Sequence, residues 1–553
     1  MFGLSAQELP DFRSPIDHAI RLSGSFGELR SNHFHAGIDL KSSKGISGDP
    51  LYSISEGYIY RVMLHPTGYG NALIIRHDNG YTSVYAHLDR FETNLGIKIL
   101  TAQYETRSYV MDYYPGPDEW RVSKGQLIGY MGNTGYSFGP HLHFEIRRTE
   151  DDMLFNPLMF GYEIVDNVPP VMDVFRWYAL DSTRQELKAG NLKLIKKTGG
   201  YAPVKDTLLI PGDYAALSLS TIDFMTGVAN RNGVYKLELY VDDTLHYQYQ
   251  MDSFLRKDTR YLNAHTDYNE YFYNKKYFHR LHRLPGNNIN LYPYLRDDGV
   301  FPVDSGSFRR VRMISYDYHN NSSAATLVIG RDTATASFKP PKHTHVLEPN
   351  TPYHYLFPGC ELLIPENMYY ERTYMQLSSQ VEKTHNAQSN ALVILNGREP
   401  LHGFYEMRFE AGHIPDSLKA KAFIGSRNGN SISNYGGEWS GDTLVTKARS
   451  NGRFAVYIDT IPPKIKATQF QPGRSKLRNF SFNFSDNFAR AGDAEKWQID
   501  VFLNDEWFLA NYNGRSNNIT VPLATVPKGK NHIKVSITDS MGNVGTWERE
   551  FLR

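Results

Sequence analysis

The chain has 553 residues, with 60 Lys and Arg against 59 Asp and Glu, and a formal net charge of +1. This length predicts about three to four domains. The balanced charge excludes the basic field that would attract nucleic acid or an anionic membrane surface. Cys360 is the single cysteine, so an intrachain disulfide and a cysteine-type zinc site are excluded as well.

The first residues, Met1 to Gln7, read like the last few residues of a signal peptide, which end in small side chains. The charged start and the full apolar stretch of an intact signal are not visible. We therefore interpret residues 1–25 as an N-terminal segment that includes a signal-peptide remnant. No run of about 18 apolar residues occurs, so no transmembrane segment is expected.

Two histidines stand two positions apart in a strand-like run at 141–147. Alternate residues of a strand point to the same face, so His141 and His143 would face one cavity. Leu142 and Phe144 would then point into the core. One imidazole of this pair can bind a metal while the other handles protons.

Earlier in the chain, His35 and Asp39 stand four positions apart in a His-Ala-Gly-Ile-Asp motif, and His87 lies in a Tyr-Ala-His-Leu motif. One helical turn or a tight loop would bring His35 and Asp39 to one ion. Zn²⁺ accepts imidazole nitrogen and carboxylate oxygen, and three protein ligands with one water form a hydrolytic centre.

Any single one of the 20 histidines is more often structural than a metal ligand. We interpret His33 and His77 as structural on this basis. Three histidine motifs in a fixed order, each in a glycine-rich context, are much more specific than the pair alone. The glycines at 132, 135 and 139 would let a loop beside the paired histidines form one wall of a substrate groove.

With these motifs in place, residues 26–157 resemble the lysostaphin-like, LytM-type zinc metallopeptidases, which cut peptidoglycan cross-bridges. The motifs that carry the resemblance are Phe26-Gly-Glu-Leu-Arg30, His35-Ala-Gly-Ile-Asp39, Gly57-Tyr-Ile-Tyr60, Gly68-Tyr-Gly-Asn71, Tyr85-Ala-His-Leu88, Gly125-Gln-Leu-Ile-Gly129, Gly132-Asn-Thr-Gly135 and Gly139-Pro-His-Leu-His-Phe-Glu145.

The resemblance implies that His35, Asp39 and His143 bind one Zn²⁺ and that His87 and His141 are the catalytic histidines. One of these two would act as general base, and the other would stabilise the oxyanion or protonate the leaving amine. The sequence leaves open which does which. The resemblance also implies an exported endopeptidase of the periplasm or cell envelope, which acts on peptidoglycan peptide cross-links.

Two other functions stay open. A LytM-type adaptor would activate another cell-wall hydrolase without cleaving anything itself, although all five site residues are present. A zinc peptidase with a protein substrate is the other alternative. Residues 89–124 are longer than the family pattern by roughly 20 residues, a length of loop that is usually functional or disordered. They could form a lid or a substrate-selecting wall, or an extra hairpin without a role.

Beyond residue 165 the chain reads as strands, with an internal repeat. Four cues recur in order: Asp166-Asn-Val-Pro-Pro170 with Asp459-Thr-Ile-Pro-Pro463, Thr221-Ile-Asp-Phe224 with Phe484-Ser-Asp-Asn487, Tyr240-Val-Asp-Asp243 with Phe502-Leu-Asn-Asp505, and Ser315-Tyr-Asp-Tyr-His-Asn320 with Ser536-Ile-Thr-Asp-Ser-Met-Gly-Asn543. The acidic turns could hold Ca²⁺, but none has the ligand spacing of an EF-hand.

We therefore predict an all-β chain, in which an antiparallel β-sheet peptidase domain is followed by two to three β-sandwich domains that resemble immunoglobulin-like modules. The predicted domains are the peptidase at 26–165, a sandwich with a Tyr-rich insertion at 166–335, a sandwich at 336–458, and an Ig-like sandwich at 459–553. The sandwiches would serve as spacers or dock a cell-envelope protein partner.

Overall fold

The computed structural model describes residues 9–334, 336–384, 386–396, 399–471, 478–490 and 497–553. Strands dominate these residues, which confirms the predicted all-β class. The described helices are few and short; α1 (Thr93–Thr106) is the longest of them. None of these helices is long and apolar enough to cross a membrane.

The N-terminal body is built on one antiparallel sheet in the order β1-β4-β13-β8-β7-β6-β10. Its strands are β1 (Leu22–Gly24), β4 (Ile38–Lys41), β13 (His141–Arg148), β8 (Tyr81–Ala86), β7 (Asn71–His77), β6 (Gly57–Leu64) and β10 (Met111–Tyr113). β13 is central, and its register sets His143 opposite Asp39 of β4 and opposite Ala86 of β8. The pairing therefore brings the three histidine motifs to one place.

The inward side chains of these strands explain why the sheet forms. Leu40, Leu142, Phe144 and Tyr85 are fully buried in one core. The N-terminal segment joins this core, since Phe12 is buried in it. As predicted from the alternation, Leu142 and Phe144 lie on the face opposite the histidines. Burial of such side chains contributes about 1.5–3 kcal/mol each.

The second body contains a large curved sheet in the order β20-β19-β15-β16-β17-β28-β27-β21-β22-β25. Its long strands are β15 (Val171–Leu180), β16 (Glu186–Lys197), β19 (Tyr214–Phe224), β27 (Phe308–Tyr316) and β28 (Ser322–Arg331). The shorter ones are β17 (Gly200–Pro203), β20 (Arg231–Asn232), β21 (Lys236–Val241), β22 (Thr244–Gln250) and β25 (Tyr294–Leu295). One short strand, β23 (Ser253–Leu255), pairs instead with β14 (Met153–Phe155) of the first body. The two bodies thus share backbone hydrogen bonds.

The third body has two sheets. One has the order β29 (His345–Leu347), β32 (Thr373–Gln380), β33 (Ala391–Asn396), β39 (Gly452–Ile458), β35 (Ala422–Asn428), β36 (Ser431–Asn434) and β42 (Ala489–Arg490). The other has the order β30 (Tyr353–Phe357), β31 (Cys360–Ile364), β34 (Tyr405–Glu410), β38 (Thr443–Ala448) and β37 (Glu438–Ser440). The fourth pairs β40-β41-β46-β45 with β44-β43-β47-β48, two four-stranded sheets around one core. The strands of this last sandwich are β40 (Lys464–Gln469), β41 (Asn479–Ser485), β43 (Gln498–Leu503), β44 (Glu506–Trp507), β45 (Asn511–Asn513), β46 (Asn518–Pro522), β47 (Lys530–Thr538) and β48 (Val544–Leu552).

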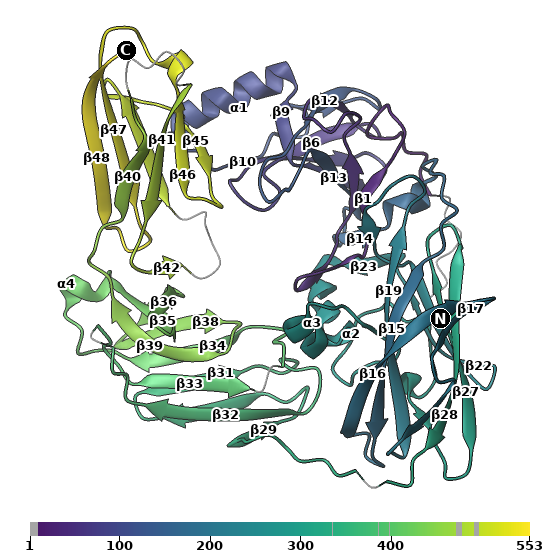
Figure 1. Cartoon of the computed structure of the whole chain (residues 1–553). Helices are drawn as coiled ribbons and strands as arrows, with labels where there is room; N and C mark the ends of the chain where they lie inside the picture. Colours follow the sequence, from purple (N-terminus) through teal and green to yellow (C-terminus); the bar gives the residue numbers. More distant parts are fainter. Residues whose placement is uncertain (1–8, 335, 385, 397–398, 472–477, 491–496) are drawn as a thin grey trace.

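The four bodies follow one another around a closed ring, in which α1 of the first body reaches the fourth (Figure 1). Tyr109, just after α1, donates its hydroxyl hydrogen to the carbonyl of Phe508 at 2.7 Å and accepts from the backbone N–H of Ala510 at 2.9 Å. The ring of Tyr104 lies edge-on to Trp507, with centroids 5.5 Å apart. The 89–124 segment therefore contains the end of β9 (Leu88–Phe91), α1, β10 and β11 (Arg121–Val122), and α1 with the residues just after it docks the last sandwich.

Candidate metal centre

Three side chains from β4, β13 and the turn before β4 converge in the buried floor of the first body. His35 Nε2 lies 3.1 Å from Asp39 Oδ1, His143 Nδ1 lies 3.0 Å from the same oxygen, and the two nitrogens are 3.0 Å apart. All three side chains are at least nine-tenths buried. Two ligands of a tetrahedral Zn²⁺ lie about 3.3 Å apart, so this triangle is close to the size that the ion needs.

The outer hydrogen bonds of the two imidazoles show which nitrogens are free to bind an ion. His35 Nδ1 donates to the carbonyl of Ser25 at 2.8 Å, and His143 Nε2 donates to Glu145 Oε1 at 2.8 Å. A neutral imidazole carries one N–H, so the two inward nitrogens present lone pairs. With Asp39, three acceptors face one another, and a cation between them satisfies all three.

Charged groups around the triangle hold Asp39 and Glu145 ionised. Burial works against this, but His35 and His143 outweigh it and hold the pKa of Asp39 well below its usual range. Arg30 also donates to Asp39 Oδ2 at 2.6 Å. Arg147 lowers the pKa of the fully buried Glu145 in the same way.

The protonation of the two inward histidines follows their partners. Burial lowers the pKa of His35 to about 4. Burial alone would lower that of His143 too, but its hydrogen bonds to Asp39 and Glu145 prevail and raise the pKa to about 9. A metal ion competes with that proton, so ion binding at neutral pH releases it.

His87 and His141 form a second pair beside the triangle. Their ring centroids are 4.8 Å apart, and His141 Nε2 lies 3.7 Å from Asp39 Oδ1. His87 Nδ1 donates to the carbonyl of Thr134 at 2.9 Å, and His141 Nδ1 donates to the carbonyl of Gly139 at 2.8 Å. Each therefore keeps a lone pair on Nε2, the form that a general base needs.

Burial, followed by repulsion from His143 and His141, lowers the pKa of His87 to about 3. His87 also has a positive φ of 65°, which is uncommon for a residue other than glycine. Its neutral form is thus favoured at neutral pH, and its backbone conformation directs the ring toward the centre.

Two glycines position the 132–135 loop, whose Thr134 carbonyl accepts the hydrogen bond from His87. Gly70 and Gly135 have φ of 66° and 69°, and a Cβ on Gly135 would come within 2.3 Å of the Gly70 nitrogen. The hairpin at 68–71 therefore packs directly on the 132–135 loop, and this packing sets the carbonyl of Thr134. The glycines at 132 and 135 were expected to let this loop form a wall beside the paired histidines, and here the loop lies next to His87.

Comparison with known proteins agrees with this geometry. Residues 33–109 and 104–157 match Peptidase family M23, and residues 344–459 match a Zu5-like domain. The chain carries a domain of peptidase family M23. This match confirms the resemblance of residues 26–157 to zinc metallopeptidases of this family.

Two relatives of the M23 domain are named as endopeptidases. The DD-carboxypeptidase/endopeptidase Mpg of Neisseria meningitidis serogroup B is 33% identical over 132 residues, covering 23% of this chain and 24% of that one. The peptidoglycan DD-endopeptidase ShyA of Vibrio cholerae serotype O1 is 31% identical over 140 residues, covering 24% and 26%. The chain thus spans about a quarter of the length of the curated relatives it matches.

Among solved structures, the catalytic domain of lysostaphin from Staphylococcus simulans is 24% identical, covers 25% of this chain and 87% of that one, and has a TM-score of 0.19. A zinc-containing peptidase from Vibrio cholerae is 29% identical, covers 24% and 35%, and has a TM-score of 0.17.

The last sandwich lies next to the M23 domain at the rim of the metal centre. A polar cavity of about 590 Å³ lies between the 133–135 loop and residues 509–513. Arg515 places its guanidinium 5.3 and 4.9 Å from the ring centroids of Tyr136 and Phe138. The fourth body therefore forms a wall beside the loop that precedes His141.

Ser25, Arg30 and Glu145 were not among the predicted site residues, although each forms a hydrogen bond with a residue of the triangle. Glu145 had a visible signal, because it continues the alternation of His141 and His143 on the same face of β13. His77, interpreted as structural, is buried against Ser83, and His33 bonds to the carbonyl of Ser31.

Proposed function

We propose that this protein is a zinc-dependent endopeptidase that hydrolyses peptide cross-links of peptidoglycan. The observation that carries the proposal is the convergence of three buried lone-pair donors, His35, Asp39 and His143, beside the two further histidines His87 and His141. An M23 domain with relatives named peptidoglycan endopeptidases supports the substrate class.

The donor set fits Zn²⁺, since two imidazoles and one carboxylate are ligands this ion prefers. When bound, the ion lowers the pKa of a coordinated water toward roughly 7 and polarises the scissile carbonyl. His87 and His141 then handle protons through their Nε2 atoms, one removing the proton from water and the other serving the oxyanion or leaving amine. Glu145 and Ser25 hold the ligand imidazoles in their tautomers.

The location and organisation follow from this proposal. A protein that cuts the cell wall acts outside the cytoplasm, so we infer an exported protein of the periplasm or cell envelope. We propose the domain boundaries 26–165, 166–335, 336–458 and 459–553, with the last three domains serving to dock a cell-envelope partner and to build the rim of the cleft.

The test is digestion of purified peptidoglycan by the zinc-loaded full chain, with released fragments identified by mass spectrometry. Loss of cross-linked dimers, abolished in His141→Ala and by chelation, is expected. Intact dimers together with activation of a purified amidase that persists in His141→Ala would establish the adaptor function instead. Cleavage of proteins alone would assign a protein substrate.

A further inference from the structure

The internal repeat places a matching cluster of acidic residues at the start of each of two sandwiches. In the first copy, Asn321 donates its Nδ2 hydrogens to the Asp166 carbonyl at 3.1 Å and to Asp317 Oδ2 at 2.6 Å. In the second copy, Asn543 makes the same two bonds, to the Asp459 carbonyl at 3.2 Å and to Asp539 Oδ2 at 2.8 Å. The two copies, separated by 222 positions at Asn321 and Asn543 and by 293 positions at Asp166 and Asp459, thus build one constellation twice.

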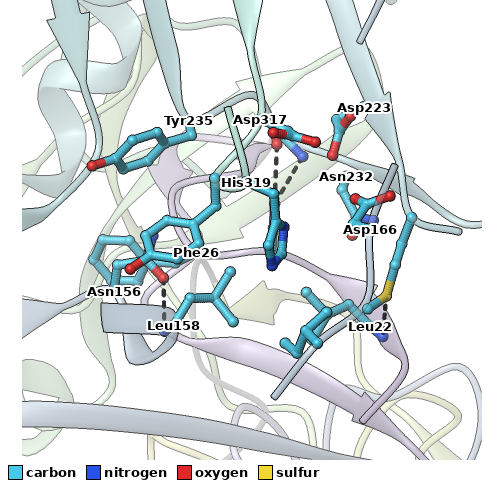
Figure 2. Close-up of a pocket in the computed structure, with 15 residues that line it drawn as sticks. Leu22, Phe26, Asn156, Leu158, Asp166, Asp223, Asn232, Tyr235, Asp317 and His319 are labelled. Atoms are coloured by element: carbon cyan, nitrogen blue, oxygen red, sulfur yellow. Dashed lines mark hydrogen bonds between the residues drawn. The ribbon is translucent and has the colours of Figure 1, made fainter. Parts of the chain in front are cut away.

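In the first copy the acidic residues face a small cavity that also receives two unsatisfied oxygens. Asp166, Asp223, Asp317 and Asn232 all line this cavity of about 30 Å³ (Figure 2). Asp223 and Asn232 are 6% and 4% exposed, and Oδ1 of each has no hydrogen-bond partner among the described residues. Such buried oxygens require a donor or a cation.

The charges of this first cluster repel one another in the bare protein. Burial, followed by the charges of Asp317 and Asp166, raises the pKa of Asp223 to about 8. Burial also raises the pKa of Asp317. A bound cation would relieve both effects, because it replaces carboxylate repulsion with attraction.

The second copy brings three carboxylates together at the matching positions, with Asp486 partly buried where Asp223 is buried. One carboxylate oxygen each of Asp459, Asp486 and Asp539 lie within 4.8 Å of one another. Asp486 Oδ1 has no hydrogen-bond partner among the described residues, as for its counterpart Asp223. Burial raises the pKa of Asp486 to about 6.

We propose that each cluster is a binding site for a hard divalent cation, Ca²⁺, at the entrance of its sandwich. Ca²⁺ takes carboxylate and amide oxygens and tolerates irregular geometry. His319 lies within ligand distance in the first cluster, but Met541 holds the matching place in the second. The ligands that the two copies share are therefore carboxylates, which suit Ca²⁺ better than a transition metal.

The first site lies at the junction of the M23 domain and the sandwich that follows. Ser25 Oγ accepts from the Gly233 N–H at 2.8 Å, next to Asn232, while the Ser25 carbonyl accepts from His35. A cation held at Asn232 would therefore stabilise this junction. Ser25 connects the junction to the metal centre, because it bonds both to Gly233 and to His35. The proposal does not depend on the peptidase function.

The test is calcium binding to the zinc-loaded full chain, measured by equilibrium dialysis with Ca²⁺ as the only added metal. We expect two Ca²⁺ per chain, with dissociation constants on the order of 10⁻⁴ M. Asp223→Asn and Asp486→Asn should each remove one Ca²⁺, and the double variant should bind none. Asp505→Asn, at a side chain 97% exposed, is the matched control and should keep two.

Two Ca²⁺ bound by the double variant, or no saturable uptake by the unchanged chain, would overturn the proposal. Thermal melting shows whether the variants fold: without Ca²⁺ they should melt no lower than the unchanged chain, because they lose a repelled carboxylate. Only the unchanged chain should gain stability when Ca²⁺ is added. A loss of more than about tenfold in calcium affinity in His319→Ala would contradict an oxygen-only ligand set.

Discussion

The substitution Glu145→Gln tests whether a residue that does not bind the ion controls the zinc affinity of the site. Glu145 is fully buried, and its Oε1 accepts from His143 Nε2 at 2.8 Å and from the Tyr69 hydroxyl at 2.5 Å. Oε2 accepts from Arg147 Nε at 2.7 Å. A carboxamide keeps the shape but offers one acceptor oxygen, so it cannot serve all these donors.

The expected loss can be worked out in two parts. Losing the group that orients a ligating histidine weakens metal binding by about 10–100-fold, or roughly 1.4–2.8 kcal/mol. Removing one partner of a buried ion pair destabilises the fold by about 3–5 kcal/mol. The lower end applies here, because Arg147 keeps a second partner, Asp152 Oδ1 at 3.0 Å.

The assay is a zinc competition titration against a chromogenic chelator, with urea unfolding of the same samples. Tyr69→Phe is the matched control, since it removes one neutral hydrogen bond to the same carboxylate and should change zinc affinity by less than about threefold. Zinc affinity of Glu145→Gln within about twofold of the unchanged protein would refute the argument that Glu145 fixes the His143 tautomer.

Three further predictions concern the catalytic pair, the ring closure and acid stability. His141→Ala should keep its zinc, measured as metal content, but lose about 10²–10⁴-fold in turnover; loss of zinc would make His141 a ligand. Tyr109→Phe removes two hydrogen bonds to the 508–510 backbone and should weaken docking by roughly 1–3 kcal/mol, seen as faster hydrogen exchange at 507–513; unchanged exchange would contradict the docking role. Burial lowers the pKa of His279 to about 3 from 6.5, so the stability it contributes is complete above pH 6.5 and falls as the pH drops toward 3. Urea unfolding at pH 7.5 and 5 should show a loss of about 2 kcal/mol from this residue, absent in His279→Gln; an equal loss in both proteins would contradict the assignment.

The sequence was sufficient to predict the β13 strand, because apolar and polar residues alternate strictly from His141 to Ile146. The same alternation places Glu145 on the face of His141 and His143, so its hydrogen bond to His143 could have been predicted from the sequence. The contacts of Ser25 and Arg30 could not, because they depend on the pairing of β1 with β4 and on side-chain directions that local pattern does not give.

The 89–124 segment shows a second limit. Its length indicated a functional or disordered loop, with a lid, a substrate-selecting wall and an extra hairpin without a role as alternatives. Its partner lies about 400 residues later, at Phe508 and Ala510, and no local pattern in either segment identifies the other. The Asp repeat was visible in the sequence, but the convergence of three separate turns on one cavity required the fold.

The most direct test of the account measures zinc content and cleavage of cross-linked muropeptide dimers on the same preparation, before and after dialysis against a chelator. The account predicts one zinc per chain in the M23 domain, loss of dimer cleavage together with the zinc, and its return with one added equivalent. Cleavage that persists in the zinc-free protein, or one bound zinc without any cleavage of dimers, would contradict it.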